Sequence, residues 1–125
     1  MVNSLEILKS RGIHLCVLTN KSVKHAKGVI ECLFQNSTFE LIIAQDEHFP
    51  LKPHPRGALY IANKFKCRPE ECVIIGDSEV DIQTGKNAGM YTVGVLWGFR
   101  SREKLEICQP DKLIESPVEL LNLFP

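Results

Sequence analysis

An acidic segment between Gly76 and Asp81 contains the side chains best suited to chemistry in this chain, and it directly follows the apolar run 72–75. Asp77 stands where that run ends, and Asp81 follows four residues later. Two carboxylates that face one point, completed by water, suit a hard cation such as Mg²⁺. We therefore predict a metal site at Asp77 and Asp81. For Asp81 the alternative is an acid in the first turn of a helix, where it complements the helix dipole.

Two other segments carry groups suited to phosphate. Thr19 offers a hydroxyl and Asn20 a main-chain amide, which can hold a phosphoryl oxygen without adding a competing charge; the alternative is a plain strand-ending turn. Lys52 lies in the segment 49–55, whose three prolines stiffen the backbone and fix where the ammonium group points. Most lysines are simply solvated, but a lysine held in this way can neutralise a phosphate. Thr19, Asn20 and Lys52 are thus the predicted phosphate-binding residues.

The composition limits the classes of protein to consider. A chain of 125 residues with 44% hydrophobic content can form one domain around a single buried core. Its 15 basic and 15 acidic residues give a formal charge of zero, so nothing favours a nucleic-acid partner. There is no apolar run of about 18 residues and no signal-peptide pattern. We therefore expect a cytoplasmic protein that does not enter a membrane.

The cysteines and histidines form no recognisable metal-binding pattern. The cysteines are odd in number and contain no Cys-x-x-Cys pair, which disfavours a disulfide framework and a zinc knot. They are Cys16, Cys32, Cys67, Cys72 and Cys108, and the histidines are His14, His25, His48 and His54. We expect most of the cysteines to be small core residues and the histidines to be structural or on the surface.

Strand-like and helix-like segments alternate along the whole chain, which predicts an α/β fold with a parallel sheet covered on both faces. Strands are expected at 14–18, 41–44, 72–75, 91–95 and, as an edge strand, 112–114. Helices are expected at 3–11, 22–34, 55–66 and 80–88, in a short segment after residue 101, and at 117–123. Gly12 and Gly89 are predicted to end two of these helices as glycine caps. Ligands of such sheets bind at the carboxyl ends of the strands, which is where the candidate residues fall.

The order of Thr19, Lys52, Asp77 and Asp81 along the chain resembles the haloacid dehalogenase (HAD) superfamily of phosphohydrolases. Residues 18–21 look like its second motif, 52–55 like its third and 76–81 like its fourth, while 81–90 and 92–100 are similar to the phosphoglycolate phosphatase subgroup. The resemblance implies a HAD-like Rossmannoid three-layer sandwich. It also implies a Mg²⁺-dependent phosphomonoester hydrolase that acts through an aspartyl-phosphate on a small phosphorylated metabolite.

Carried onto this sequence, the family pattern gives each candidate a role. Thr19 and Lys52 would be catalytic residues that hold and neutralise the phosphoryl group, with Asn20 beside them, and Asp77 and Asp81 would hold the metal. A response-regulator receiver domain uses similar residues, but it places its acidic pair first, whereas the acids come last here. The order of the residues therefore excludes that reading.

One family motif has no counterpart in this sequence. Family members carry an upstream Asp-x-Asp-x-(Thr/Val) motif, whose first Asp attacks phosphorus. The aspartates here are Asp46, Asp77, Asp81 and Asp111, and no two of them are two residues apart. Residues 1–125 are therefore expected to be the C-terminal portion of a HAD-like core domain, without the nucleophile strand and the cap. We expect the chain alone to show no phosphatase turnover.

By the same resemblance, the absent strand would be the middle one, between the strands ending at Thr19 and Asp77. Each buried backbone group left unpaired costs about 1–3 kcal/mol, against a typical total stability of about 5–15 kcal/mol. We expect a marginal or rearranged chain, in which the two strands move together, another chain fills the gap, or the protein self-associates. The alternative to an enzyme is a non-catalytic truncated module that binds Mg²⁺ and phosphate or pairs with a separate N-terminal fragment.

Overall fold

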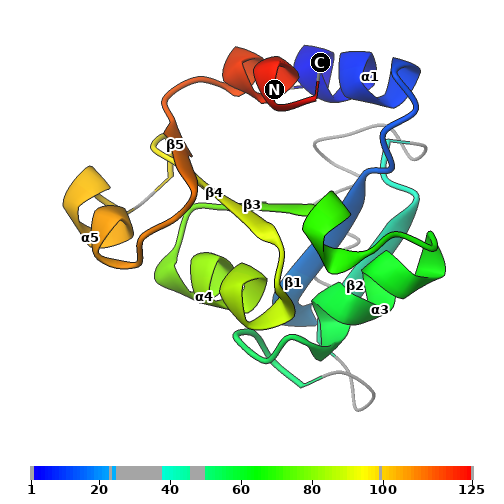
Figure 1. Cartoon of the computed structure of the whole chain (residues 1–125), viewed down its shortest axis with the longest axis horizontal. Helices are drawn as coiled ribbons and strands as arrows, with labels where there is room; N and C mark the ends of the chain where they lie inside the picture. The colour runs from blue at the N-terminus through cyan, green and yellow to red at the C-terminus, as the bar shows by residue number, and fades with distance from the viewer. Residues whose placement is uncertain (1, 23, 25–37, 46–49, 99, 125) are drawn as a thin grey trace.

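The described strands are all paired in parallel, but they form two small sheets. The computed structural model describes residues 2–22, 24, 38–45, 50–98 and 100–124. One sheet pairs β1 (Cys16–Ser22) with β2 (Leu41–Gln45). In the other, β4 (Tyr91–Val95) lies between β3 (Val73–Gly76) and β5 (Lys112–Ile114) (Figure 1). The predicted α/β class and the edge position of residues 112–114 are confirmed, and in the described part of the chain no pairing joins β1 to β3.

The helices fall close to the predicted segments. They are α1 (Val2–Ser10), α3 (Arg56–Lys64), α4 (Glu79–Ala88) and α5 (Arg102–Ile107), with 3₁₀ turns η1 (Pro69–Glu71) and η2 (Pro117–Leu123). Gly12 and Gly89 follow α1 and α4 with φ angles of 82° and 76°, a left-handed conformation that glycine adopts without steric cost. The closing segment is a 3₁₀ rather than an α-helix, and the predicted helix at 22–34 lies outside the described residues.

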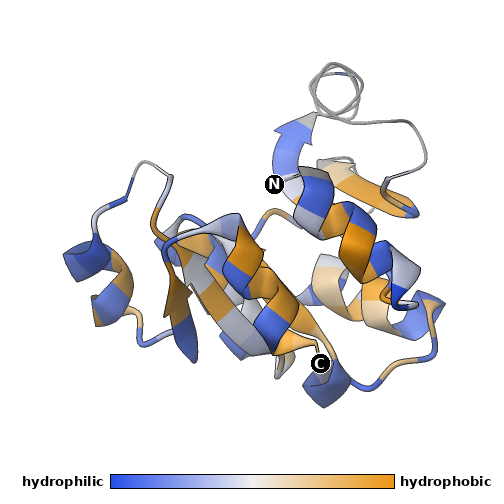
Figure 2. Cartoon of the chain, turned by 90° about the horizontal axis from the view of Figure 1, so that it is seen from above, coloured by the Kyte–Doolittle hydropathy of each residue, from blue (hydrophilic) through white to orange (hydrophobic). Residues whose placement is uncertain are grey.

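Helices cover the β3–β4–β5 sheet on both faces. In Figure 1, α1 and η2 lie above the strands and α4 lies below them, with α3 next to α4 and β1. Leu8 of α1 and Leu120 of η2 are buried against Val93 and Val95 of β4. The intervening residues of β4 point to the opposite face, where α4 packs on β3 and β4. In Figure 2 the helices carry orange and blue segments around their circumference, as expected of elements with one face on a core.

Strand β1 differs from its predicted form near the candidate site. It begins at Cys16 rather than at residue 14 and continues through Ser22, so Thr19 and Asn20 lie within it instead of closing it. Regular pairing stops at Leu18, opposite Ile43, and resumes at Ser22, opposite Gln45. Four steps along β1 thus match two along β2, so residues 19–21 bulge out of the ladder. Bulges of this kind redirect side chains next to functional sites.

The strands at the border between the two sheets are less covered than the central strand. Residues 92–95 of β4 are all buried, whereas residues 15–19 in and before β1 are only half-buried. Ile75 of β3 remains 37% exposed. A strand inside a parallel α/β sheet is normally buried on both faces. β1 and β3 therefore behave as edge strands within the described structure.

Candidate functional site

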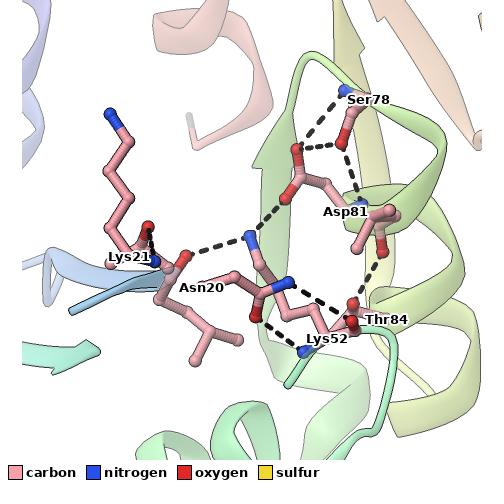
Figure 3. A network of polar contacts seen from close by, with 9 residues as sticks. Asn20, Lys21, Lys52, Ser78, Asp81 and Thr84 are labelled. Atoms are coloured by element: carbon pink, nitrogen blue, oxygen red, sulfur yellow. Dashed lines mark hydrogen bonds and ion pairs between the residues drawn. The ribbon is translucent and has the colours of Figure 1, made fainter. Parts of the chain in front are cut away.

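The ammonium group of Lys52 lies between strand β1 and the start of helix α4. Its Nζ donates to the main-chain carbonyl of Leu18 at 3.1 Å and to Oδ1 of Asp81 at 2.5 Å (Figure 3). The Lys52 and Asp81 side chains are 13% and 14% exposed, so the ion pair is largely shielded from water. These contacts join residues that are 29 and 34 positions apart in the sequence. The fold therefore brings Lys52 and Asp81, predicted from separate motifs, into direct contact.

Asn20 contacts Lys52 in a way that the sequence did not suggest. Its Oδ1 accepts a hydrogen bond from the main-chain N–H of Lys52 at 2.7 Å, and its Nδ2 donates to the Lys52 carbonyl at 3.3 Å (Figure 3). The sequence predicted a role for the main-chain amide of Asn20, with no role for its side chain. Because the partner lies 32 residues away, no local pattern could have revealed this contact.

Thr19 lies in the bulged part of β1, and its side chain is turned towards the neighbouring backbone. Its Oγ1 accepts a hydrogen bond from the main-chain N–H of Lys21 at 3.2 Å. A hydroxyl that accepts one hydrogen bond can still donate another. Thr19 is half-buried, so its hydroxyl group remains able to donate to a ligand oxygen.

Asp81 is both a helix-capping acid and the partner of Lys52. Ser78 is the N-cap of α4 and accepts from the main-chain N–H of Asp81 at 3.4 Å. In return, Asp81 Oδ2 accepts from the Ser78 hydroxyl at 3.0 Å and from its main-chain N–H at 3.3 Å. This reciprocal arrangement is a capping box, with aspartate in the place usually taken by Glu or Gln. The two interpretations offered for Asp81, helix acid and site residue, are therefore compatible.

Asp77 has different surroundings, in the turn between β3 and α4. No hydrogen bond or ion pair joins its carboxylate to any other described residue. Gly98, in the turn after β4, packs so closely that a Cβ there would lie 2.3 Å from the Asp77 Cβ and 2.4 Å from Oδ2. Only glycine fits at this position without displacing Asp77. The turn after β4 thus supports the acidic turn after β3.

An ion pair on the surface links the same two turns. Arg100 Nε donates to both carboxylate oxygens of Glu79 at 3.1 Å. The pKa of Glu79 is held below its ordinary range, first by a hydrogen bond from its own backbone and then by the Arg100 contact. Exposed pairs of this kind contribute little to stability. The contact nevertheless places a further positive charge beside the acidic segment.

The donor chemistry of these residues is compatible with Mg²⁺. In the part of the chain that the structure describes, no cluster of three or more His, Cys, Asp or Glu side chains is placed to hold a metal ion. Mg²⁺ keeps several of its waters and commonly binds proteins through one or two carboxylates. Asp77, with a carboxylate that no described residue engages, fits such a ligand. Asp81 would have to share its oxygens with Lys52 and Ser78.

The described histidines make structural contacts. The His14 ring stacks on Phe65 with centroids 4.3 Å apart, and its Nδ1 lies 2.9 Å from a Glu40 carboxylate oxygen. His54 Nδ1 accepts from the main-chain N–H of Arg56 at 3.1 Å. The structural role expected of these two histidines agrees with the contacts, and His25 and His48 lie outside the described residues.

The described cysteines are free and half-buried. They are Cys16, Cys67, Cys72 and Cys108, while Cys32 lies outside the described part. Burial raises the pKa of the Cys16 thiol from 9.0 to about 11, with smaller contributions from the charges of Glu40 and Cys72. Burial likewise raises the pKa of Cys72. Thiols with raised pKa values are poor nucleophiles, which disfavours a catalytic cysteine at these two positions.

Comparison with known proteins identifies the family. The model of the haloacid dehalogenase-like hydrolase family matches residues 1–95. The chain belongs to this family. Phosphoglycolate phosphatase from Aquifex aeolicus is 35% identical over 121 residues, covering 97% of this chain and 55% of the relative. The Escherichia coli K12 enzyme of the same name is 31% identical over 121 residues, covering 97% of this chain and 48% of the relative. The chain spans about half the length of the curated relatives it matches.

Solved structures agree with this assignment. A predicted phosphoglycolate phosphatase from Haemophilus somnus 129pt superposes with a TM-score of 0.91 at 28% identity, covering 98% of this chain and 55% of the other. A haloacid dehalogenase-like hydrolase from Streptococcus pneumoniae gives a TM-score of 0.87 at 26% identity, with coverages of 99% and 58%. Because nearly the whole chain is covered at once, its two sheets have the mutual placement found in these HAD-like Rossmannoid proteins.

None of the described helices is long and apolar enough to span a membrane.

Proposed function

We propose that this chain provides the phosphate-binding and metal-binding part of a Mg²⁺-dependent phosphomonoester hydrolase of the phosphoglycolate phosphatase type. The observation that carries the proposal is the position of Lys52, whose ammonium group contacts both β1 at Leu18 and the acidic segment at Asp81. Family membership and phosphoglycolate phosphatase relatives support the reaction class. The substrate would be a small phosphorylated metabolite, and the protein would act in the cytoplasm.

Each residue has a chemical task in this proposal. The Thr19 hydroxyl and the Asn20 main-chain N–H would donate to phosphoryl oxygens, while Lys52 would neutralise their charge. Asp77, with a share from Asp81, would hold Mg²⁺, which when bound stabilises charge on the phosphoryl oxygens. Lys52 is catalytic in this scheme because its charge faces the reacting group. Its pairing with Asp81 fixes that charge before substrate arrives, so little reorganisation is needed.

The attacking carboxylate would come from outside this chain. The family mechanism uses an aspartyl-phosphate, and this sequence has no Asp-x-Asp pair to form it. We therefore propose that the chain alone does not turn over. Among the described aspartates, Asp81 is the one in contact with Lys52, and its carboxylate is already engaged in capping α4.

The alternative proposal is a non-catalytic module that binds Mg²⁺ and phosphate or pairs with a separate N-terminal fragment. It is favoured by the division of the strands into two sheets, with β1 and β3 each paired on one side only within the described residues. A strand added between β1 and β3 would provide hydrogen-bond partners for the unpaired edge of each. Self-association through the same edges is the competing outcome.

Phosphate release tests the two proposals. The chain is incubated with Mg²⁺ and 2-phosphoglycolate or p-nitrophenyl phosphate, alone and mixed with a family N-terminal fragment bearing Asp-x-Asp-x-(Thr/Val). Release only in the mixture, lost on Asp77→Asn or Lys52→Met but kept in the exposed control Lys64→Met, supports the enzyme proposal. Release by the chain alone contradicts the external nucleophile. If neither the chain alone nor the mixture releases phosphate, while Mg²⁺ binding is retained, the result supports the non-catalytic module.

A further inference from the structure

The loop that carries Lys52 is attached to β1 through Asn20. The Asn20 carboxamide meets the Lys52 main chain with its acceptor against the N–H, at 2.7 Å, and its donor against the carbonyl, at 3.3 Å. Turning the amide over would set donor against donor and acceptor against acceptor, so the pattern fixes the orientation of the group. The Asn20 side chain alone thus makes a donor and an acceptor contact with the Lys52 main chain, as the backbone of a neighbouring strand would do.

The remaining contacts of the loop explain why this attachment matters. His54 N–H donates to the Leu51 carbonyl at 3.1 Å, which closes the loop on itself. Asn87 of α4 donates to the Pro53 carbonyl at 2.9 Å, which ties the loop to the opposite side of the site. Among the hydrogen bonds of the described residues in this loop, those from Asn20 hold the main chain of Lys52 itself.

The two ends of Lys52 are therefore fixed to the same stretch of β1. Asn20 holds its main chain, and the Leu18 carbonyl, two residues earlier, accepts from its ammonium group at 3.1 Å. A lysine side chain has several rotatable bonds, so a fixed backbone origin is needed before its charge can occupy one place.

We propose that the Asn20 side chain is a positioning residue for Lys52. It holds the Lys52 main chain so that the ammonium group stays between Leu18 and Asp81, while the main-chain amide of Asn20 is left to meet a ligand. As a role in phosphate handling, this inference rests on the proposed function. As a statement about the placement of Lys52, it can be tested without substrate, metal or a second fragment.

Limited acetylation of lysines, read by mass spectrometry, provides the test. The full chain is labelled briefly with N-acetoxysuccinimide, and Lys52 is compared with the exposed Lys64 and Lys86 in the same sample. In Asn20→Ala we expect Lys52 labelling to rise by at least about two- to tenfold, because the loss of one net hydrogen bond gives this range and the variant loses two. Lys64 and Lys86 should not change. Asn63→Ala, which removes an exposed asparagine from α3, is the matched control and should leave all three rates unchanged.

Two results would overturn the inference. One is an unchanged ratio of Lys52 to the reference lysines in a folded Asn20→Ala chain. The other is a rise of all three lysines in proportion, which would mean general loosening. If circular dichroism shows that Asn20→Ala does not fold, Asn20→Ser is labelled in its place, with the same outcomes. The absence of phosphate release would not change the acetylation result. Failure of the proposed function and failure of this inference are therefore distinguishable.

Discussion

Single residues in this site carry more than one task. Asp81 caps helix α4 through Ser78 and also pairs with Lys52, and each of its carboxylate oxygens serves one of these partners. Gly76 permits this arrangement, because a Cβ there would lie 2.2 Å from the Asp81 Cβ. The fixed carboxylate in turn fixes the Lys52 charge. In the proposed function, this helix-capping interaction would therefore also hold the Lys52 charge in place for the phosphoryl group.

The Cys16 thiol gives a prediction about how the stability of the chain depends on pH. Its folded-state pKa is about 11, above the ordinary value of 9.0, mainly because of burial. An unfolded chain therefore loses the Cys16 proton first as the pH rises, and deprotonation draws the equilibrium towards unfolding. The stabilisation is fully present below pH 9 and is lost as the pH rises through 11. We expect the free energy of unfolding, measured by urea titration, to fall across this window.

The Cys16→Ala variant isolates this contribution. It cannot ionise at that position, so its stability should fall less steeply between pH 9 and 11 than that of the unsubstituted chain. Other groups also titrate in this range, and the comparison of the two slopes removes their shared effect. Identical slopes would show that the Cys16 thiol is as easily ionised in the folded chain as in the unfolded one.

At the level of elements, local sequence signals predicted most of the fold. Gly12, Gly89 and Ser101 mark helix ends that the structure confirms, because capping depends on a few neighbouring residues. The bulge at residues 19–21 and the Asn20 contact with Lys52 were not predicted. Both depend on pairing with β2 or the proline-rich loop, which lie more than 20 residues away in the sequence. The register between segments far apart in the sequence produces no pattern among neighbouring residues, so it could not be predicted from the sequence.

The packing of α4 on its sheet gives a prediction for Gly85. A Cβ at this position would lie 2.2 Å from Ile74 Cγ2 and 2.5 Å from Thr92 Cγ2, on β3 and β4. Helix propensity alone would make Gly85→Ala stabilising by about 1 kcal/mol. Overpacking in a close contact typically costs about 1–3 kcal/mol, and the two strands leave no room to relax. We therefore expect Gly85→Ala to destabilise the chain by up to about 2 kcal/mol net.

Thermal unfolding of two variants measures the sign of this effect. Lys86→Ala, on the exposed side of the same helix, is the control and should stay within about 0.5 kcal/mol of the unsubstituted chain. A rise in melting temperature for Gly85→Ala would mean that α4 can move away from β3 and β4. In that case the close helix-to-sheet contact would not be needed to place the acidic turn that precedes α4.

For the whole molecule, the decisive feature is the interrupted sheet. The Lys52–Asp81 ion pair joins the loop anchored on β1 to the helix that follows β3, so it links the two sheets at the edge where the candidate residues gather. The strands themselves are not paired across this border in the described structure. The curated relatives are about twice as long as this chain, and the similar solved structures superpose on both of its sheets together. The mutual placement of the sheets is therefore kept without a backbone ladder between them.

Hydrogen exchange tests whether this border is open in solution. β4 has a partner on each side, whereas β3 has one described partner, so alternate N–H groups of β3 lack a strand acceptor. In dilute, monomeric chain we expect residues 73–76 to exchange faster than residues 91–95, and residues 16–18 of β1 to resemble β3. Adding the family N-terminal fragment should slow exchange in β1 and β3 while leaving β4 unchanged. Equal protection of β3 and β4 in the monomer alone would mean that the two sheets close on each other, and the gap proposed to receive another strand would not exist.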